Sequence, residues 1–177
     1  GCDQITVHAR KAWLKGLSPK ENRDIPPLDY ARVYRLKQRL PQIPVAINGG
    51  LTDLATCEQQ LAHVDGVMLG RAAYHQPELL LSVDPLFYGT PSPAPDVFAA
   101  LETFEPYIAA HLEKGGSLHS IPRHMLGLFT GRPGARAFRR HLATEAVRRD
   151  AGLSVLQEAI AKVDRHWTPE PPQQKAA

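Results

Sequence analysis

The chain has 177 residues, of which 43% are hydrophobic and 22% are charged, and its formal net charge is +3. These are ordinary values for a folded globular protein, and no stretch approaches the roughly 18 to 20 apolar residues that a membrane span needs. Cys2 and Cys57 support neither a disulfide framework nor a metal site, so the composition predicts a cytoplasmic protein without a membrane or metal partner.

The first part of the chain alternates between strand and helix patterns. Residues 4–8 form a short run rich in β-forming side chains. The polar, charged segment 9–27 is long for a loop of an alternating fold, which favours a functional or partner-facing role. Residues 29–40 are a predicted helix with Asp29 as its N-cap. Because a core-type strand stands so early, we expect the chain to be the rear part of a longer protein.

Two more strand patterns follow this helix, at residues 44–48 and 65–69. Thr52 is the predicted N-cap of the helix between them, which runs to about residue 62. A short helix is expected after the second of these strands. Alternation of this kind argues for a parallel sheet or barrel, and the predicted fold class is α/β, the C-terminal part of a (β/α)₈ TIM barrel.

Residues 85–95 hold four prolines and a glycine and are a predicted linker. Strand patterns stop there, and a small all-α helical domain is expected beyond it. Its predicted helices are 96–113, 120–129, 134–149 and 154–164, the first kinked or broken at Pro106. The predicted divisions are the barrel part (1–84), the linker (85–95), the helical domain (96–165) and a disordered tail rich in proline and glutamine (166–177).

Glycines follow the second and third predicted strands. Asn48, Gly49 and Gly50 end the second strand, and Gly70 and Arg71 end the third. Barrel enzymes place their active sites at this end of the strands, and the last two loops often bind a phosphate. Glycine lets the backbone approach the anion, N–H groups point at its oxygens, and arginine adds charge. The pattern therefore predicts a phosphate site, the alternative being two ordinary glycine turns.

His8 ends the first predicted strand, at the same rim as the two glycine turns. From there it would face the barrel mouth, where a ring-shaped ligand could form a hydrogen bond. The alternative is a histidine with a structural role only.

Positive charge is concentrated in residues 114–149, which contain eight Lys or Arg residues and one acid, a net charge of +7. Such a block favours a polyanionic partner, and the alternative is a solvated helix surface. Arg136 and Arg139 stand three apart and are predicted to share a helix face. Leu126, Leu128 and Phe129 are interpreted as core of the helical bundle.

Four motifs carry a resemblance to a known family. Residues 7–23 (VHARKAWLKGLSPKENR), 47–50 (INGG), 65–74 (DGVMLGRAAY) and 123–136 (RHMLGLF followed by GRPGAR) resemble, in order and spacing, the tRNA-dihydrouridine synthases of the A-type bacterial branch. The likeness covers about residues 1–150. The first and last motifs are specific to that branch, whereas Asn-Gly-Gly and Gly-Arg occur in many phosphate-binding barrels.

The resemblance implies a monomeric enzyme that reduces uridine 20 or 20a of the tRNA D-loop to 5,6-dihydrouridine, using FMN and NADPH. It implies that His8 contacts the flavin and that the ribityl phosphate is held by Asn48, Gly49, Gly50, Gly70 and Arg71. It implies tRNA contacts by Lys20, Arg23, Arg136 and Arg139, and the basic loop adds Arg10. Chemistry on a base requires that the uridine be unstacked and drawn into the pocket.

The chain departs from the family pattern because it lacks the Asn-x-x-Cys-Pro motif, whose cysteine donates the proton in that family, and an earlier lysine that contacts the flavin. No catalytic residue is therefore predicted within it, and by itself it is expected to be inactive. Two other hypotheses stay open: a different phosphate- or flavin-binding barrel enzyme, and a non-catalytic RNA-binding module. The basic helical segment argues against the first of these. Unpaired strand edges of a partial barrel also predict poor solubility.

Overall fold

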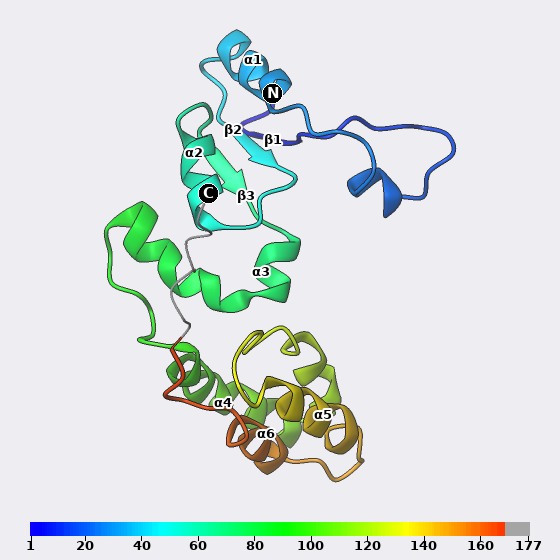
Figure 1. The fold of residues 1–177 in the computed structure, drawn as a ribbon, viewed down its shortest axis with the longest axis vertical. Helices are drawn as coiled ribbons and strands as arrows, with labels where there is room; N and C mark the ends of the chain where they lie inside the picture. Colours follow the sequence, from blue (N-terminus) through cyan, green and yellow to red (C-terminus); the bar gives the residue numbers. More distant parts are fainter. Residues whose placement is uncertain (169–177) are drawn as a thin grey trace, which may run out of the picture. The chain divides into compact units, whose positions relative to one another are not determined.

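Three parallel strands form one sheet at the start of the chain, which the computed structural model describes from residue 1 to residue 168 (Figure 1). Their order is β1 (Ile5–His8), β2 (Val45–Asn48) and β3 (Gly66–Met68). In the register, His8 lies opposite Asn48, and Asn48 lies opposite Met68. The predicted α/β alternation is confirmed, and the sheet is consistent with part of a barrel.

Helices connect these strands, as the alternating pattern predicts. Helix α1 (Tyr30–Arg39) begins after Asp29, whose carboxylate accepts the N–H of Arg32, so the predicted N-cap is confirmed. Helix α2 (Leu54–Leu61) begins one residue later than expected. The predicted cap Thr52 is wrong because Asp53 adopts the extended cap conformation and accepts the Thr56 N–H at 2.7 Å. The Thr52 hydroxyl instead donates to the Asp53 carboxylate.

Burial in the sheet is uneven. Val45, Ala46 and Ile47 of β2 are buried, whereas β1 and β3 contain no fully buried residue, and Met68 is 51% exposed. Parallel sheets normally have both faces covered and every inner strand paired on both sides. The edges at β1 and β3 are therefore the features expected where further barrel strands would pair.

The chain divides into two compact units, Gly1–Ala73 and a second that begins at Tyr74. The short helix α3 (Arg71–His75), predicted after the third strand, spans this division. A 3₁₀ segment, η2 (Pro77–Ser82), and a π-helical turn, η3 (Asp84–Tyr88), follow, so part of the predicted linker is regular structure. The domain bounds 1–84, 85–95 and 96–165 stay predictions, and most of the tail 166–177 lies outside the described residues.

The second unit contains helices α4 (Val97–Glu113), α5 (Ala135–Glu145) and α6 (Leu153–Ile160), and no strand within its described residues. Asp96 caps α4 by accepting the N–H of Ala99. Pro106 lies inside α4 without ending it, so the alternative of a break is wrong and the alternative of a kink stays a prediction. Leu101 and Ile108, buried on either side of the exposed Pro106, hold both parts of the helix on the core.

The helix predicted at 120–129 is also wrong. This stretch overlaps two 3₁₀ turns, η4 (Leu118–Ser120) and η5 (Pro122–His124), and then forms irregular turns. Phe129 has a left-handed backbone, with φ of 61°, a conformation that costs a side-chain-bearing residue about 1–2 kcal/mol. Its ring is 1% exposed, so burial of a large aromatic offsets that cost.

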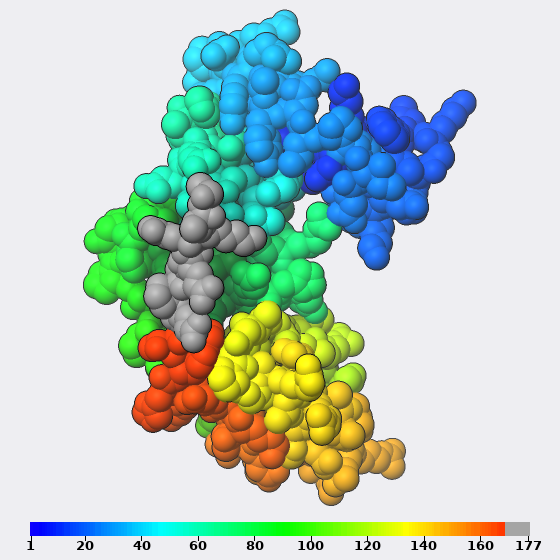
Figure 2. Space-filling view, in the orientation of Figure 1, coloured from blue at the N-terminus to red at the C-terminus, as the bar shows by residue number. Residues whose placement is uncertain are grey.

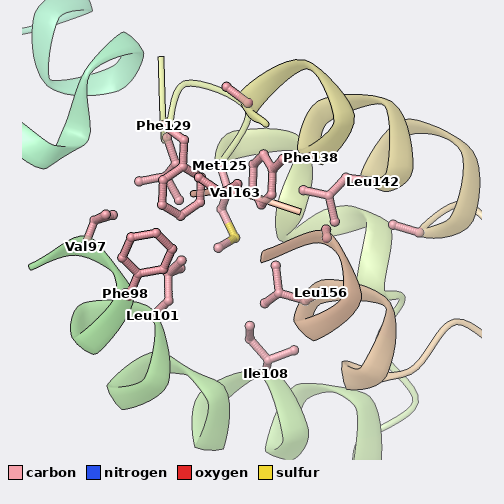
Figure 3. Packing of buried hydrophobic residues seen from close by; sticks show 14 of the residues in the cluster. Val97, Phe98, Leu101, Ile108, Met125, Phe129, Phe138, Leu142, Leu156 and Val163 are labelled. Carbon is pink, nitrogen blue, oxygen red and sulfur yellow. The ribbon is translucent and has the colours of Figure 1, made fainter. Parts of the chain in front are cut away.

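One hydrophobic core holds the second unit together (Figure 3). The Phe129 ring packs edge-on against Phe138, with centroids 5.0 Å apart, and lies 4.9 Å from the Phe98 ring. Ile108 of α4 and Leu156 of α6 close the opposite end of the cluster. Leu128 and Phe129 are buried as predicted, whereas Leu126 is 37% exposed, so its assignment to the core is wrong.

Candidate functional site

The carboxyl ends of the three strands bring His8 and Asn48 together. Asn48 Nδ2 donates to the Met68 carbonyl at 2.6 Å, which fixes the amide so that Oδ1 faces His8. His8 Nδ1 lies 2.7 Å from that oxygen and must therefore carry the hydrogen. The ring nitrogen left for a ligand is Nε2. His8 and Asn48, singled out separately in the sequence, thus form one connected pair across β1, β2 and β3.

The turn after β2 requires its two glycines. Gly49 and Gly50 have φ of 108° and 71°, in the region that favours glycine. A Cβ on Gly50 would lie 2.5 Å from Leu28 Cδ1 and 2.9 Å from the Tyr30 hydroxyl oxygen. That hydroxyl donates to the Gly49 carbonyl at 2.9 Å, so Tyr30 of α1 holds the turn in place. The sequence did not identify this role of Tyr30.

Gly70, after β3, stands in different surroundings. A Cβ built on it meets no atom within 4 Å. Within residues 1–168 the backbone N–H groups of Gly49, Gly50 and Gly70 have no hydrogen-bond acceptor. Unpaired N–H donors in the turns after two adjacent strands, with open space at one of them, are groups that can bind a phosphate.

Arg71 follows Gly70, and its guanidinium contacts a loop residue. Its Nη1 lies 2.5 Å from Asp24 Oδ1, and the Arg71 side chain is 63% exposed. Hydrogen bonding to Arg71 lowers the pKa of the Asp24 carboxyl. One nitrogen of a guanidinium with five N–H donors is used in this way, which leaves others for an anion. Asp24 was missed in the sequence because it stands among basic residues, far from Arg71 along the chain.

The loop 9–27 is closed at its base by Arg10. Arg10 Nη1 donates to the carbonyls of Asp24, at 3.1 Å, and Pro26, and Arg10 forms an antiparallel bridge with Leu28. The predicted tRNA contact Arg10 therefore uses its guanidinium within the loop in this structure. Its role toward RNA stays a prediction.

The outer part of the loop is also ordered by local hydrogen bonds. Ser18 and Glu21 form a reciprocal capping box at η1 (Glu21–Arg23), and Trp13 and Asn22 exchange two hydrogen bonds. Lys20 and Arg23 are exposed on this turn. In Figure 2 the blue segment that holds the loop projects from the rest of the first unit. The loop thus exposes Lys20 and Arg23, two of the predicted tRNA contacts, on a turn that local hydrogen bonds hold in place.

The basic residues of the second unit have different surroundings. Arg136 is exposed and Arg139 is half-buried, both on α5. Arg132 is 15% exposed, pairs with Glu78 at 2.6 Å and lies 5.7 Å from the centroid of the Phe98 ring. Arg132 therefore contributes to packing within the second unit. The positive charge that segment 114–149 exposes at the surface is smaller than its net charge of +7.

Comparison of the sequence with known protein families identifies the family of this chain. A model described as dihydrouridine synthase (Dus) matches residues 1–164. The chain belongs to the dihydrouridine synthase family.

Relatives within the family carry the name tRNA-dihydrouridine(20/20a) synthase. The protein of Vibrio parahaemolyticus is 53% identical over 165 residues, which cover 93% of this chain and 51% of that protein. The proteins of Shewanella oneidensis and Pseudomonas syringae pv. tomato are 51% and 49% identical, over 92% and 94% of this chain and 49% of each relative. The chain spans about half the length of the curated relatives it matches, and corresponds to their C-terminal half.

Neither cysteine of this dihydrouridine synthase chain lies with His8 and Asn48. Cys2 precedes β1 and is exposed, about six residues and therefore roughly 20 Å of extended chain from His8. Cys57 is buried inside α2, and burial raises the pKa of its thiol. A buried thiol of raised pKa in a helix is a packing residue, and the absence of a catalytic residue from this chain stays a prediction.

None of the helices within residues 1–168 is long and apolar enough to cross a membrane. Over the same residues, no three His, Cys, Asp or Glu side chains gather closely enough to hold a metal ion.

Proposed function

We propose that this chain is the half of an enzyme that binds the cofactor phosphate and the RNA, and that the enzyme reduces uridine 20 or 20a of tRNA to 5,6-dihydrouridine. The observation that carries this proposal is the match, at 53% identity over 165 residues, to a relative named for that reaction. The connected pair of His8 and Asn48 at the same edge as unpaired glycine N–H groups supports a bound cofactor there.

FMN is the cofactor that these residues fit. The backbone N–H groups of Gly49, Gly50 and Gly70 would bind its phosphate, and Arg71 would add a positive charge. Nε2 of His8 is free to hydrogen-bond to the flavin, because Nδ1 is held by Asn48. Bound FMN supplies the hydride donor for the uracil double bond, and NADPH is proposed as the source of its electrons.

The proton donor is proposed to lie outside these residues, on an earlier strand, as in the family. Cys2 stands at the amino end of β1 and Cys57 is enclosed in α2, so neither supports that role. The chain is proposed to contribute cofactor binding and tRNA placement, within an enzyme that acts as a cytoplasmic monomer.

The tRNA is proposed to contact the loop 9–27 and helix α5. Lys20 and Arg23 are exposed on the loop, and Arg136 is exposed on α5. Arginine and lysine contacts to phosphate position RNA without reading its sequence. Arg10, with its guanidinium inside the loop, is proposed to act on tRNA by holding the loop that carries Lys20 and Arg23.

Catalysis is tested with a chimera in which the N-terminal half of the Vibrio parahaemolyticus relative precedes this chain. It should purify with FMN and convert tRNA uridine to dihydrouridine with NADPH, measured by mass spectrometry of tRNA digests. A chimera that binds FMN and tRNA but forms no dihydrouridine would refute the proposed reaction.

The cofactor site is tested by Gly70→Ala in the chimera. The new methyl enters open space, so stability should be unchanged while FMN affinity falls, because the methyl stands where the phosphate approaches. Arg71→Ala should also weaken FMN binding. Fluorescence titration of FMN, with thermal unfolding of the cofactor-free protein as the control, measures both. Unchanged affinity in both variants would remove this turn from the site.

A further inference from the structure

A cleft of about 540 Å³ lies within the second unit. It is bounded by the last residues of α3, by η5 and the turns after it, and by α5. Its chemistry comes from two arginines, two histidines, a tyrosine and a threonine: Arg123, Arg139, His75, His124, Tyr74 and Thr130. No carboxylate is among its described lining residues, so the cleft is positively charged.

Hydrogen bonds inside the cleft fix the state of His124. Arg123 Nε donates to His124 Nε2 at 3.0 Å, so Nε2 carries a lone pair and the ring hydrogen is on Nδ1. His124 Nδ1 lies 3.0 Å from the Tyr74 hydroxyl oxygen and donates to it. The Tyr74 hydroxyl therefore keeps its own hydrogen free for an acceptor in the cleft. Arg123, His124 and Tyr74 form a directed chain that ends in an O–H donor.

Tyr74 also offers an aromatic surface. Its ring meets the His75 and His124 rings edge-on, at interplanar angles of 81° and 75°, and the residue is 52% exposed. These contacts hold the ring, and about half of the residue stays exposed to solvent. A flat heterocycle stacks well on such a ring.

Gly127 sets the position of this tyrosine. A Cβ on Gly127 would lie 2.5 Å from the His75 carbonyl oxygen and 2.9 Å from that of Tyr74. The two backbones therefore pack directly against each other, which a side chain at residue 127 would prevent. The neighbouring Leu126 also lines the cleft, which accounts for its exposure.

The charge continues past the cleft along α5. Arg136 and Arg140 are exposed on the helix that carries Arg139, and within residues 1–168 no acid pairs with any of the three. A mononucleotide would need only the cleft, whereas a continuous basic surface suits a polymer of phosphates.

We propose that this cleft is a subsite for one nucleotide of the RNA substrate. The guanidinium groups of Arg123 and Arg139 bind its phosphate, its base stacks on Tyr74, and the Tyr74 hydroxyl donates to a phosphate or ribose oxygen. The proposal rests on the proposed function in taking the RNA to be tRNA. The proposal adds Tyr74, Arg123 and His124 to the residues that recognise the tRNA. His124 is a positioning residue, because it orients the Tyr74 hydroxyl.

The test is tRNA binding by the chimera, measured by fluorescence anisotropy at several salt concentrations. Tyr74→Ala should weaken binding about tenfold and Tyr74→Phe about threefold, since the latter loses only the hydroxyl. Arg123→Gln should weaken it about fivefold and lower the salt slope by about one. Arg148→Gln is the matched control, because Arg148 is exposed and pairs with Glu145 at 2.8 Å. It should bind within about twofold of the unaltered chimera.

Circular dichroism and thermal unfolding check that each variant is folded, and Tyr74→Phe keeps the ring if Tyr74→Ala does not fold. The subsite is overturned if Tyr74→Phe and Arg123→Gln bind tRNA as the unaltered protein does while Arg136→Ala with Arg140→Ala, two exposed arginines outside the cleft lining, binds less. It is also overturned if AMP or inorganic phosphate fills the cleft without displacing tRNA. Failure of the chimera to form dihydrouridine, with the Tyr74 and Arg123 effects intact, would refute the reaction and leave the subsite standing.

Discussion

The two units bury their hydrophobic residues to very different degrees. In the first, β2 is buried along its apolar length, while β1 and β3 are open edges with half-exposed side chains. In the second, helices α4, α5 and α6 enclose one cluster that contains three phenylalanines, Phe98, Phe129 and Phe138. A parallel sheet gains stability only when both its faces and its edges are covered, whereas a helical bundle covers itself. The candidate cofactor site thus lies on the incompletely covered unit.

The largest effect expected from this difference is on autonomous folding. Residues 74–168 alone should unfold cooperatively in urea, because their core is contained within them. Residues 1–73 alone should show no cooperative transition and should aggregate, because two strand edges are unpaired. Circular dichroism against urea and size-exclusion chromatography measure both. A cooperative unfolding transition of residues 1–73 alone would contradict the conclusion that the first unit is incompletely covered.

Phe138→Ala should lower the free energy of unfolding of the second unit by about 3–5 kcal/mol, because a fully buried ring is replaced by a cavity. Phe104→Ala is the matched control on α4: Phe104 is 38% exposed and packs against Tyr107, so its loss should cost less than about 1.5 kcal/mol. Urea unfolding of residues 74–168 gives both values. Equal destabilisation by the two variants would contradict the core as described.

The parts that sequence predicted correctly are those fixed by local signals. Asp29 caps α1 because an acid before an apolar stripe is a local feature, and the glycine turns follow short strand patterns. The helix at 120–129 failed because burial of Phe129 imposes a backbone that its own propensity opposes. Tertiary packing, which no local window contains, decided that segment.

The candidate site divides in the same way. His8, Asn48 and the glycines could be proposed from the sequence because each ends or follows a strand, and parallel strands bring their ends to one edge. The Arg71–Asp24 pair joins residues 47 positions apart, and neither spacing nor composition points to it. The cleft at Tyr74 likewise joins residues 50 positions apart, so only the fold reveals that Tyr74 and His124 are partners.

In the first unit the two glycine turns should respond differently to the same substitution. Gly50→Ala forces a methyl group against Leu28 at a left-handed backbone and should destabilise the chimera by about 1–2 kcal/mol or more. Gly70→Ala adds the same methyl group where no atom lies within 4 Å, and should change stability by less than about 0.5 kcal/mol. Thermal unfolding of the cofactor-free chimera compares them. If the two variants lose equal stability, the turn after β2 is not constrained as described.

The smallest expected effect concerns the ion pair between Asp24 and Arg71. Because hydrogen bonding to Arg71 lowers the pKa of Asp24 in the folded chain, its stabilising contribution is present at neutral pH. It is lost as the pH falls through that lowered pKa, below the ordinary value of about 4. Asp24→Asn should therefore reduce amide-exchange protection of the loop 9–27 at pH 7 by less than a core substitution would, because both side chains are partly exposed.

Lowering the pH should remove the difference between the two proteins, since a protonated Asp24 and an asparagine both lack the charge. Glu21, whose pKa is also lowered, by hydrogen bonds from Ser18, titrates in both proteins and cancels in the comparison. Protection factors, corrected for the intrinsic pH dependence of exchange, give the measurement. Equal protection of the loop in both proteins at pH 7 would mean that the first unit holds its projecting loop through Arg10 and the local turns alone, without the cofactor-site arginine.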